Sequence, residues 1–115
     1  MDKDTRKKAD KLIKLALSKK AEDPLFLDTS NVNIIWDAFI IVSADSQRQL
    51  EAICRFLVKE SSKQDIAIHH KEIDELSWGF IDFYDVAFNI FLKSSRDFYN
   101  LENLWRDAKV IKINK

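Results

Sequence analysis

Two acidic residues in the second half of the chain have the type and spacing of a metal-binding pair. Asp82 and Asp85 are three residues apart, and paired carboxylates can hold the divalent ions used in phosphoryl transfer. On a strand, however, a spacing of three turns the two side chains to different faces, unless a turn restores the geometry. Phosphoryl transfer would also need a phosphate-binding loop. We therefore predict no metal site and no enzyme, and keep a metal-dependent nucleotidyltransferase remnant as an alternative.

The other residues with reactive side chains give no catalytic set. His69 and His70 are adjacent on a predicted strand, so they point to opposite faces and cannot chelate one ion together. Cys54 falls on the apolar face of a predicted helix, where burial raises the pKa of a thiol and disfavours a reactive thiolate. The chain has a single glycine, which excludes a Walker loop and a dinucleotide-binding fingerprint. No cofactor is expected.

The composition describes one compact domain over residues 1–115. The sequence is 46% hydrophobic and 33% charged, with one Gly and one Pro. The lone cysteine excludes an internal disulfide and, with no secretory leader, predicts a cytoplasmic protein. No apolar run approaches the roughly 20 residues that cross a bilayer, so we expect no membrane span. Nineteen basic and nineteen acidic residues cancel, which argues against non-specific nucleic-acid binding as the main activity.

The hydrophobic periodicity predicts an α/β (α+β) fold, a single mixed β-sheet flanked by helices. Apolar residues at helical spacing predict a first helix over residues 1–20, which should end at Asp23 and Pro24 because proline cannot continue it. A short strand is expected over 25–27, and the apolar run 38–42 predicts a strand buried on both faces.

The rest of the chain continues this alternation of strands and helices. Ser46 and Gln49 form a capping box that should open a second helix, whose apolar face includes Cys54. Residues 66–68 suggest a third short strand, and 71–75 a polar connection. Further elements are predicted near the C-terminus: a short helix capped by Ser94 and Asp97, and an edge strand over 110–113.

Residues 78–92 predict a β-hairpin whose two-residue turn is Tyr84-Asp85. In this register the residue pairs on the core face are Phe83 with Val86, Ile81 with Phe88, and Gly79 with Ile90. The other face carries Trp78, Phe80 and Asp82 beside Ala87, Asn89 and Phe91. Large aromatics in a polar frame are typical of a partner-binding surface. A helix of the same chain covering this face is an equal alternative.

The charge is distributed unevenly along the chain. Residues 1–20 hold eight basic and three acidic groups, a net +5, and residues 21–115 hold a net −5. A solvated face on a packing helix explains the lysines, and an electrostatic arm toward a polyanion such as ribosomal RNA is the alternative. A mitochondrial import sequence is disfavoured because such segments are poor in acidic residues.

Several segments in order resemble the ribosomal silencing factor family, also called Iojap or RsfS. The resemblance covers 25–108, about three-quarters of the chain. The matching segments are 37–46, Arg48, 52–53, Trp78 with Asp82, 85–91, and the block Arg96-Asp-Phe-Tyr99-Asn-Leu101-Glu102-Asn-Leu104-Trp105. The final block together with the Trp-x-x-x-Asp segment is specific to the family.

The chain departs from the family pattern at a few positions. Glycine is usual where Ala44 and Tyr84 stand, a Glu-Gly pair where residues 71–72 stand, and histidine where Asn89 stands. The turns without glycine must manage without its freedom to adopt positive φ, so local loop shapes can differ from those of relatives.

The resemblance implies a fold similar to nucleotidyltransferases but without their catalytic elements, with the family core over residues 24–108 and a tail over 109–115. It also implies binding to the large ribosomal subunit through its fourteenth protein, which blocks joining of the small subunit in starvation or stationary phase, and a capacity to form homodimers. A contact of ribosomal RNA with the basic first helix is a further expectation. The predicted partner-binding residues are Trp78, Phe80, Asp82, Asn89, Tyr99, Leu101 and Trp105.

Overall fold

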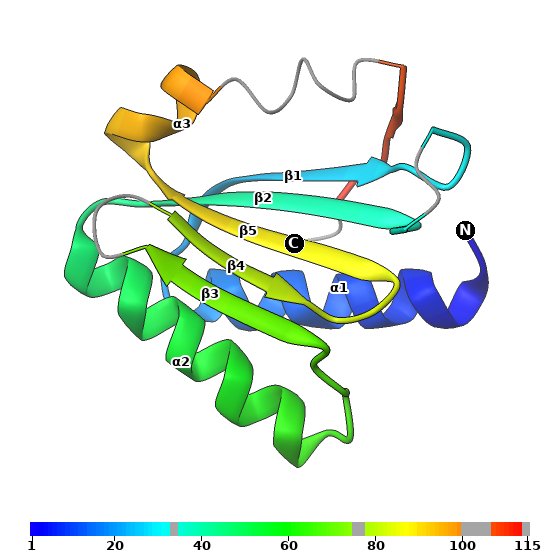
Figure 1. The fold of residues 1–115 in the computed structure, drawn as a ribbon, viewed down its shortest axis with the longest axis horizontal. Coiled ribbons are helices and arrows are strands. Elements are labelled where there is room, and N and C mark those ends of the chain that lie inside the picture. Colours follow the sequence, from blue (N-terminus) through cyan, green and yellow to red (C-terminus); the bar gives the residue numbers. More distant parts are fainter. Residues whose placement is uncertain (33–34, 75–77, 100–106, 114–115) are drawn as a thin grey trace.

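The computed structural model describes residues 1–32, 35–74, 78–99 and 107–113, and the strands among them form one six-stranded sheet (Figure 1). The strands are β1 (Glu22–Asp28), β2 (Ala38–Ala44), β3 (His70–Asp74), β4 (Trp78–Asp82), β5 (Val86–Leu92) and β6 (Lys109–Val110). Their order in the sheet is β3-β4-β5-β2-β1-β6. The central strands β2 and β5 run parallel, and the other neighbours run antiparallel. The predicted fold class, a single mixed sheet flanked by helices, is confirmed.

Two long helices pack on one face of this sheet. α1 (Lys3–Ser18) begins at Asp2, whose side chain accepts a hydrogen bond from the backbone N–H of Thr5, and α2 (Gln47–Lys63) begins at Ser46. Their apolar faces form the main core with one face of β1, β2, β4 and β5 (Figure 1). The opposite face of the sheet, which we call the distal face, carries a second and smaller apolar cluster. The third helix, α3 (Lys93–Tyr99), follows directly after β5.

The central strand β2 is buried along its whole length, as the sequence predicts. Its side chains alternate between the two faces of the sheet. Ile40 and Val42 lie in the main core, and Phe39 and Ile41 lie in the smaller apolar cluster on the distal face. The predicted N-cap of α2 at Ser46 is present, but the return hydrogen bond of the predicted capping box involves Asp45 and not Ser46. Ser46 Oγ accepts from the backbone N–H of Gln49 at 3.1 Å, and Gln49 Oε1 returns a contact to the backbone N–H of Asp45 at 2.6 Å.

The hairpin has the predicted register. Gly79 lies opposite Ile90, Ile81 opposite Phe88 and Phe80 opposite Asn89. The turn manages without glycine because Tyr84 itself adopts the left-handed conformation, with φ of 76°.

The boundary between the first helix and the first strand differs from the prediction. α1 ends at Ser18, not at Asp23 and Pro24, and Lys20 turns the chain with φ of 67°. Pro24 lies inside β1, where the register with β2 shifts between Glu22 and Leu25. A β-bulge is one of the few places in a sheet that tolerate the missing N–H of proline, so Pro24 follows the start of the strand instead of marking the end of the helix.

The third strand was predicted in the wrong place. Residues 66–68 form no strand, and the supposed polar connection is β3, which pairs with β4. β3 lies at the edge of the sheet, where charged side chains are common because they prevent pairing with another chain. Such a strand lacks the apolar alternation on which the prediction depended.

The C-terminal elements agree only in part with the prediction. α3 begins at Lys93, so Ser94 lies within the helix and does not cap it. The predicted edge strand is present but short, because β6 pairs with β1 only at Lys109 and Val110. Residues 100–106, which include part of the predicted short helix, lie outside the described residues.

Candidate functional site

The predicted face of the hairpin lies on the distal face of the sheet. Trp78, Phe80 and Asp82 project from β4, and Asn89 projects from β5 opposite Phe80. They share this face because side chains alternate along a strand, and the main core takes the residues between them. Four of the seven predicted site residues are therefore brought together by one hairpin.

Five aromatic rings form a connected group on the distal face, which we call the aromatic cluster: Trp36, Phe39, Trp78, Phe80 and Phe91. Trp78 stacks on Phe91 with ring centroids 5.7 Å apart and an interplanar angle of 8°. Trp36 meets Phe80 edge to face at 5.7 Å. Such pairs add about 0.5–1.5 kcal/mol each beyond their buried area, so they help to fix the rings relative to one another. Phe39 and Phe91 are buried, and Trp36, Trp78 and Phe80 are partly exposed.

Asn89 holds Trp78 in place from below. Its side chain is almost fully buried, and its Oδ1 accepts from the indole N–H of Trp78 at 3.3 Å. Its Nδ2 donates to the backbone carbonyl of Ile40 at 3.2 Å. Both ends of the amide are thus used inside the protein, where they fix the indole of Trp78 against β2.

Asp82 has the same role for the second indole. Its Oδ1 accepts from the indole N–H of Trp36 at 3.2 Å and from the backbone N–H of Tyr84 at 2.8 Å. Its Oδ2 lies 3.3 Å from Nδ1 of His69, whose ring is largely exposed. Asp82 is only 9% exposed, so it fixes the geometry of its neighbours and offers little surface of its own.

Asp85 faces a different part of the molecule from Asp82. Its Oδ1 lies 2.5 Å from Lys8 Nζ, and its Oδ2 accepts from Thr5 Oγ1 at 2.6 Å, both on α1. Burial raises the pKa of Asp85, but the hydrogen bonds from Lys8 and Thr5 outweigh it and hold the pKa below its ordinary value. The two carboxylates therefore serve separate partners. Within the described residues, no group of three or more His, Cys, Asp or Glu side chains is placed to hold a metal ion.

The aromatic cluster and its surroundings contain residues that the sequence analysis missed. Trp36 belongs to the cluster although it precedes β2, and the exposed ring of Tyr84 lies against His69 with centroids 5.1 Å apart. Period-two alternation could not place Trp36, because it lies in a loop. The hydrogen bond from Thr29 Oγ1 to the carbonyl of Trp36, at 2.7 Å, fixes that loop against the end of β1.

The remaining predicted site residues belong to the C-terminal part of the chain. Tyr99 is the last residue of α3, and Leu101 and Trp105 lie outside the described residues. Arg96, from the same family block, anchors α3 to the sheet: it donates to Ser43 Oγ at 2.8 Å and to the backbone carbonyl of Asp23 at 2.5 Å. Ser43 alternates with Phe39 and Ile41 on β2, so α3 is attached at one end of the distal face.

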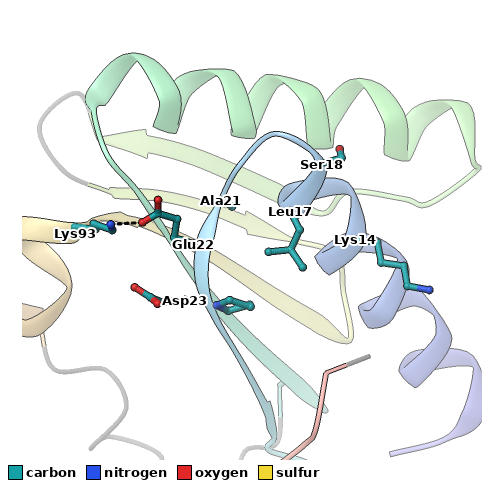
Figure 2. Close-up of a pocket in the computed structure, with 8 residues that line it drawn as sticks. Lys14, Leu17, Ser18, Ala21, Glu22, Asp23 and Lys93 are labelled. Atoms are coloured by element: carbon teal, nitrogen blue, oxygen red, sulfur yellow. Dashed lines mark ion pairs between the residues drawn. The ribbon is translucent and has the colours of Figure 1, made fainter. Parts of the chain in front are cut away.

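A surface pocket of about 670 Å³ lies elsewhere, where α1 gives way to β1 (Figure 2). Its lining includes none of the predicted site residues. Lys93 forms an ion pair with Glu22 at this pocket, and also lies 3.3 Å from Asp45. Because Lys93 is already paired with these two carboxylates, the pocket gives no reason to move the site away from the aromatic cluster.

Cys54 and the two histidines of the described chain have different surroundings. Cys54 is buried between α2 and the sheet, and burial raises the pKa of its thiol to about 12. His69 and His70 face different carboxylates, Asp82 and Glu72. None of the helices in the described part of the chain has the length and apolarity to span a membrane.

The fold and the distal face together define a class, a small mixed α/β protein with a preformed aromatic surface. Comparison of this chain with known proteins identifies its family. The family model described as ribosomal silencing factor during starvation matches residues 2–115. The chain therefore belongs to the ribosomal silencing factor family, RsfS, which confirms the resemblance seen in the sequence.

Individual relatives agree with this family along most of their length. The ribosomal silencing factor of Halalkalibacterium halodurans is 36% identical over 107 residues, 89% of this chain and 92% of the relative. That of Bacillus subtilis is 35% identical over 97 residues, 84% of this chain and 82% of the relative. A crystal structure of a Bacillus halodurans protein matches with a TM-score of 0.83 and 30% identity, covering 94% of this chain and 99% of the other.

Proposed function

We propose that this protein binds the large ribosomal subunit through its fourteenth protein and blocks joining of the small subunit. The family supports a role at the ribosome, because its model and the relatives carry the description ribosomal silencing factor. The observation that carries the proposal is the aromatic cluster, in which two indole rings are each fixed by a buried polar side chain. A surface ordered before binding loses less conformational entropy when a partner docks.

Repression in this proposal needs occupancy and no reaction. A rigid domain seated on the joining surface excludes the small subunit by its volume, and the binding free energy sets how well it competes. The protein would therefore act without catalysis or a cofactor, in the cytoplasm, when starvation or stationary phase calls for less translation. The radius of gyration of 12.9 Å describes a compact body suited to such a role.

The predicted interface residues take two different roles in this proposal. Trp78 and Phe80 are half-buried in the protein and keep surface for direct contact, which matches the large aromatic anchors of interaction hot spots. Asp82 and Asn89 position the two indoles from inside. Tyr99, Leu101 and Trp105 are proposed to extend the contact beyond α3.

The same surface also suits a homodimer. An apolar face that docks on a ribosomal protein can equally pair with its own copy, since a two-fold interface uses the same patch twice. The two uses would compete. A contact of the basic first helix with ribosomal RNA is the other part of the proposal and is developed below.

Phe80→Ala tests the docking surface directly. In sucrose gradients at a magnesium concentration that favours joining, the wild-type protein should travel with the large subunit and reduce joined ribosomes. We expect Phe80→Ala to lose at least about tenfold in affinity, because it removes an aromatic anchor. Phe56→Ala is the matched control: Phe56 lies on α2, where Lys19 Nζ approaches its ring at 4.7 Å, on the other side of the sheet.

Full activity of Phe80→Ala with a native circular dichroism spectrum would show that the distal face is not the docking surface. Equal losses in Phe80→Ala and Phe56→Ala would point to general destabilisation. A wild-type protein that leaves joining untouched and stays at the top of the gradient would refute the function itself.

A further inference from the structure

The outer side of α1 carries four lysines that neither the fold nor the docking surface uses. Lys3, Lys7, Lys11 and Lys14 are all exposed, and we call them the lysine stripe. They are four, four and three residues apart, which places them on one face of a helix with 3.6 residues per turn. The buried residues of α1 are Thr5, Ala9, Leu12, Ile13 and Ala16. At 100° per residue, the stripe lies directly opposite that buried face.

The other basic side chains of α1 are already engaged inside the protein. Arg6 pairs with Asp10 at 3.6 Å, and Lys8 with Asp85 at 2.5 Å. By contrast, no ion pair joins any lysine of the stripe to another residue in the described part of the chain. The stripe therefore presents four available positive charges over roughly 16 Å of helix, at a rise of 1.5 Å per residue.

The distribution of charge along the chain makes the first helix more positive than the rest of the protein. Residues 1–20 carry a net +5, while the whole chain carries no net charge. A molecule of this kind is not attracted to polyanions over its entire surface. It is oriented by them, with its positive side toward the negative partner.

We propose that the lysine stripe binds the phosphate backbone of double-helical ribosomal RNA. This rests on the proposed function, which brings the protein to a particle rich in structured RNA. The stripe consists of point charges on long flexible stems, which suit phosphate contacts that position a protein without reading sequence. The stripe contains no aromatic ring on which unpaired bases could stack, so it suits a duplex backbone better than a single strand.

An anionic membrane would also attract four lysines, but the rest of α1 does not suit one. A helix that lies in a bilayer interface inserts an apolar face opposite its charged face. In α1 that apolar face is already packed in the main core and cannot insert into a bilayer. Its residues Ala9, Leu12, Ile13 and Ala16 have no exposed surface. RNA backbone therefore fits the stripe better, because it requires only charge.

The stripe and the docking surface lie on opposite sides of the sheet. α1 covers the face of the sheet away from the aromatic cluster (Figure 1). Because the stripe lies opposite the buried residues of α1, its lysines are on the side of the helix that faces away from the sheet. Lys14, the last lysine of the stripe, extends from α1 away from the pair formed by Lys93 and Glu22 (Figure 2). One molecule can thus hold a protein on one side and RNA on the other at the same time.

Fluorescence anisotropy with a labelled RNA duplex of about 20 base pairs tests the stripe without any ribosomal protein present. Four phosphate contacts predict that the wild-type affinity falls about 100-fold between roughly 50 and 200 mM KCl. The stripe variant replaces all four lysines with glutamine: Lys3→Gln, Lys7→Gln, Lys11→Gln and Lys14→Gln. It should lose at least about tenfold in affinity at the lower salt, and its affinity should depend much less on salt than that of the wild type. Glutamine keeps good helix propensity, and circular dichroism checks the fold.

Two variants control for net charge and for folding. The matched control removes four charges elsewhere, at the exposed residues Arg55, Lys59, Lys63 and Lys71, also by changes to glutamine. It should bind the duplex within about twofold of the wild type, since these four side chains lie on α2 and β3 and not on the stripe, and salt screens exposed charges that do not contact the RNA. Replacing the stripe with four arginines keeps the charge and should keep the binding, which excludes a loss caused by helix damage.

The proposal is overturned if the wild type does not bind the duplex, if the stripe variant binds as well as the wild type, or if the matched control loses as much. Flotation with phosphatidylserine vesicles that depends on the stripe, without duplex binding, would assign the stripe to a membrane instead. The docking proposal fails separately: Phe80→Ala should bind the duplex normally, and a failure of subunit binding leaves the duplex result unchanged.

Discussion

Lys8 joins the first helix to the turn between β4 and β5. Its Nζ lies 2.5 Å from Asp85 Oδ1 and donates to the carbonyl of Phe83 at 2.9 Å, while Thr5 donates to the other carboxylate oxygen. Between the two contacts lies Tyr84, held at a positive φ that is uncommon for any residue other than glycine. The contacts from α1 stabilise on both sides a turn that has no glycine.

Asp85 should make the stability of the protein depend on pH. Its folded pKa is lowered, so its contribution is complete above the unfolded value of about 3.9 and is lost as pH falls through the lower folded pKa. We expect Asp85→Asn to lower the free energy of unfolding by about 1 kcal/mol at pH 7, because its side chain is partly exposed. Urea denaturation from about pH 5 to about pH 2 should show wild type and variant converging.

The exposed Asp107 provides the control for this measurement. Asp107→Asn changes the same charge without touching α1, and should leave the unfolding free energy within about 0.5 kcal/mol of the wild type at each pH. A gap between Asp85→Asn and wild type that persists at about pH 2 would mean that packing, and not the charge of Asp85, stabilises the turn.

For individual residues, the sequence predicts which face of the sheet a side chain lies on but not which group it hydrogen-bonds. Asp82 and Asn89 were predicted as partner-binding residues because they stand among aromatics, and in the structure both also have hydrogen bonds within the protein, since a polar group buried there must be paired. Trp36 could not be found at all. Its place depends on a loop held by Thr29, which is a tertiary contact without a local signal.

At the scale of the elements, the single glycine sets how closely α2 approaches the sheet. A Cβ added at Gly79 would lie 2.5 Å from Cys54 Sγ and 3.4 Å from Leu50 Cδ2. The backbone of β4 therefore packs directly beneath the helix. Gly79 serves close packing here and no special φ, because no glycine in the described residues has a positive value.

Gly79→Ala should lower the stability by about 1–3 kcal/mol, the usual cost of overpacking a core. Part of this loss should disappear in the double variant Gly79→Ala, Cys54→Ala, which removes the sulfur that the new methyl group meets. Thermal and urea unfolding of the four proteins in the cycle measure the coupling. Strict additivity of the two changes would show that α2 moves as a whole and that Cys54 is not the obstacle.

The elements that could be predicted are those whose apolar pattern is set by burial. β2 and the β4–β5 hairpin follow this rule, and even the hairpin register was correct although the turn lacks glycine. β3 was missed because an edge strand with charged side chains has no such pattern. The end of α1 was misplaced because Lys20, not glycine, adopts the left-handed turn that follows it.

At the scale of the whole molecule, the sheet separates two surfaces that would bind their partners through different interactions. The aromatic cluster offers apolar contact, whose strength changes little with salt, and the lysine stripe offers charge, whose strength falls steeply with salt. The main core lies between them, so neither surface shares a side chain with the other. Binding to a ribosomal particle should therefore contain two separable contributions.

Salt titration of binding to purified large subunits should separate these contributions. Phe80→Ala should weaken binding by the same factor at about 50 and about 200 mM KCl, because it removes apolar contact. The four-glutamine stripe variant should weaken it strongly at the lower salt and little at the higher, because counterion release is lost. Combining both sets of changes should multiply the two losses, since distant sites without shared partners are additive within about 0.5 kcal/mol. A combined loss well below that product, in proteins that remain folded, would mean that one partner covers both surfaces and that the sheet does not separate them.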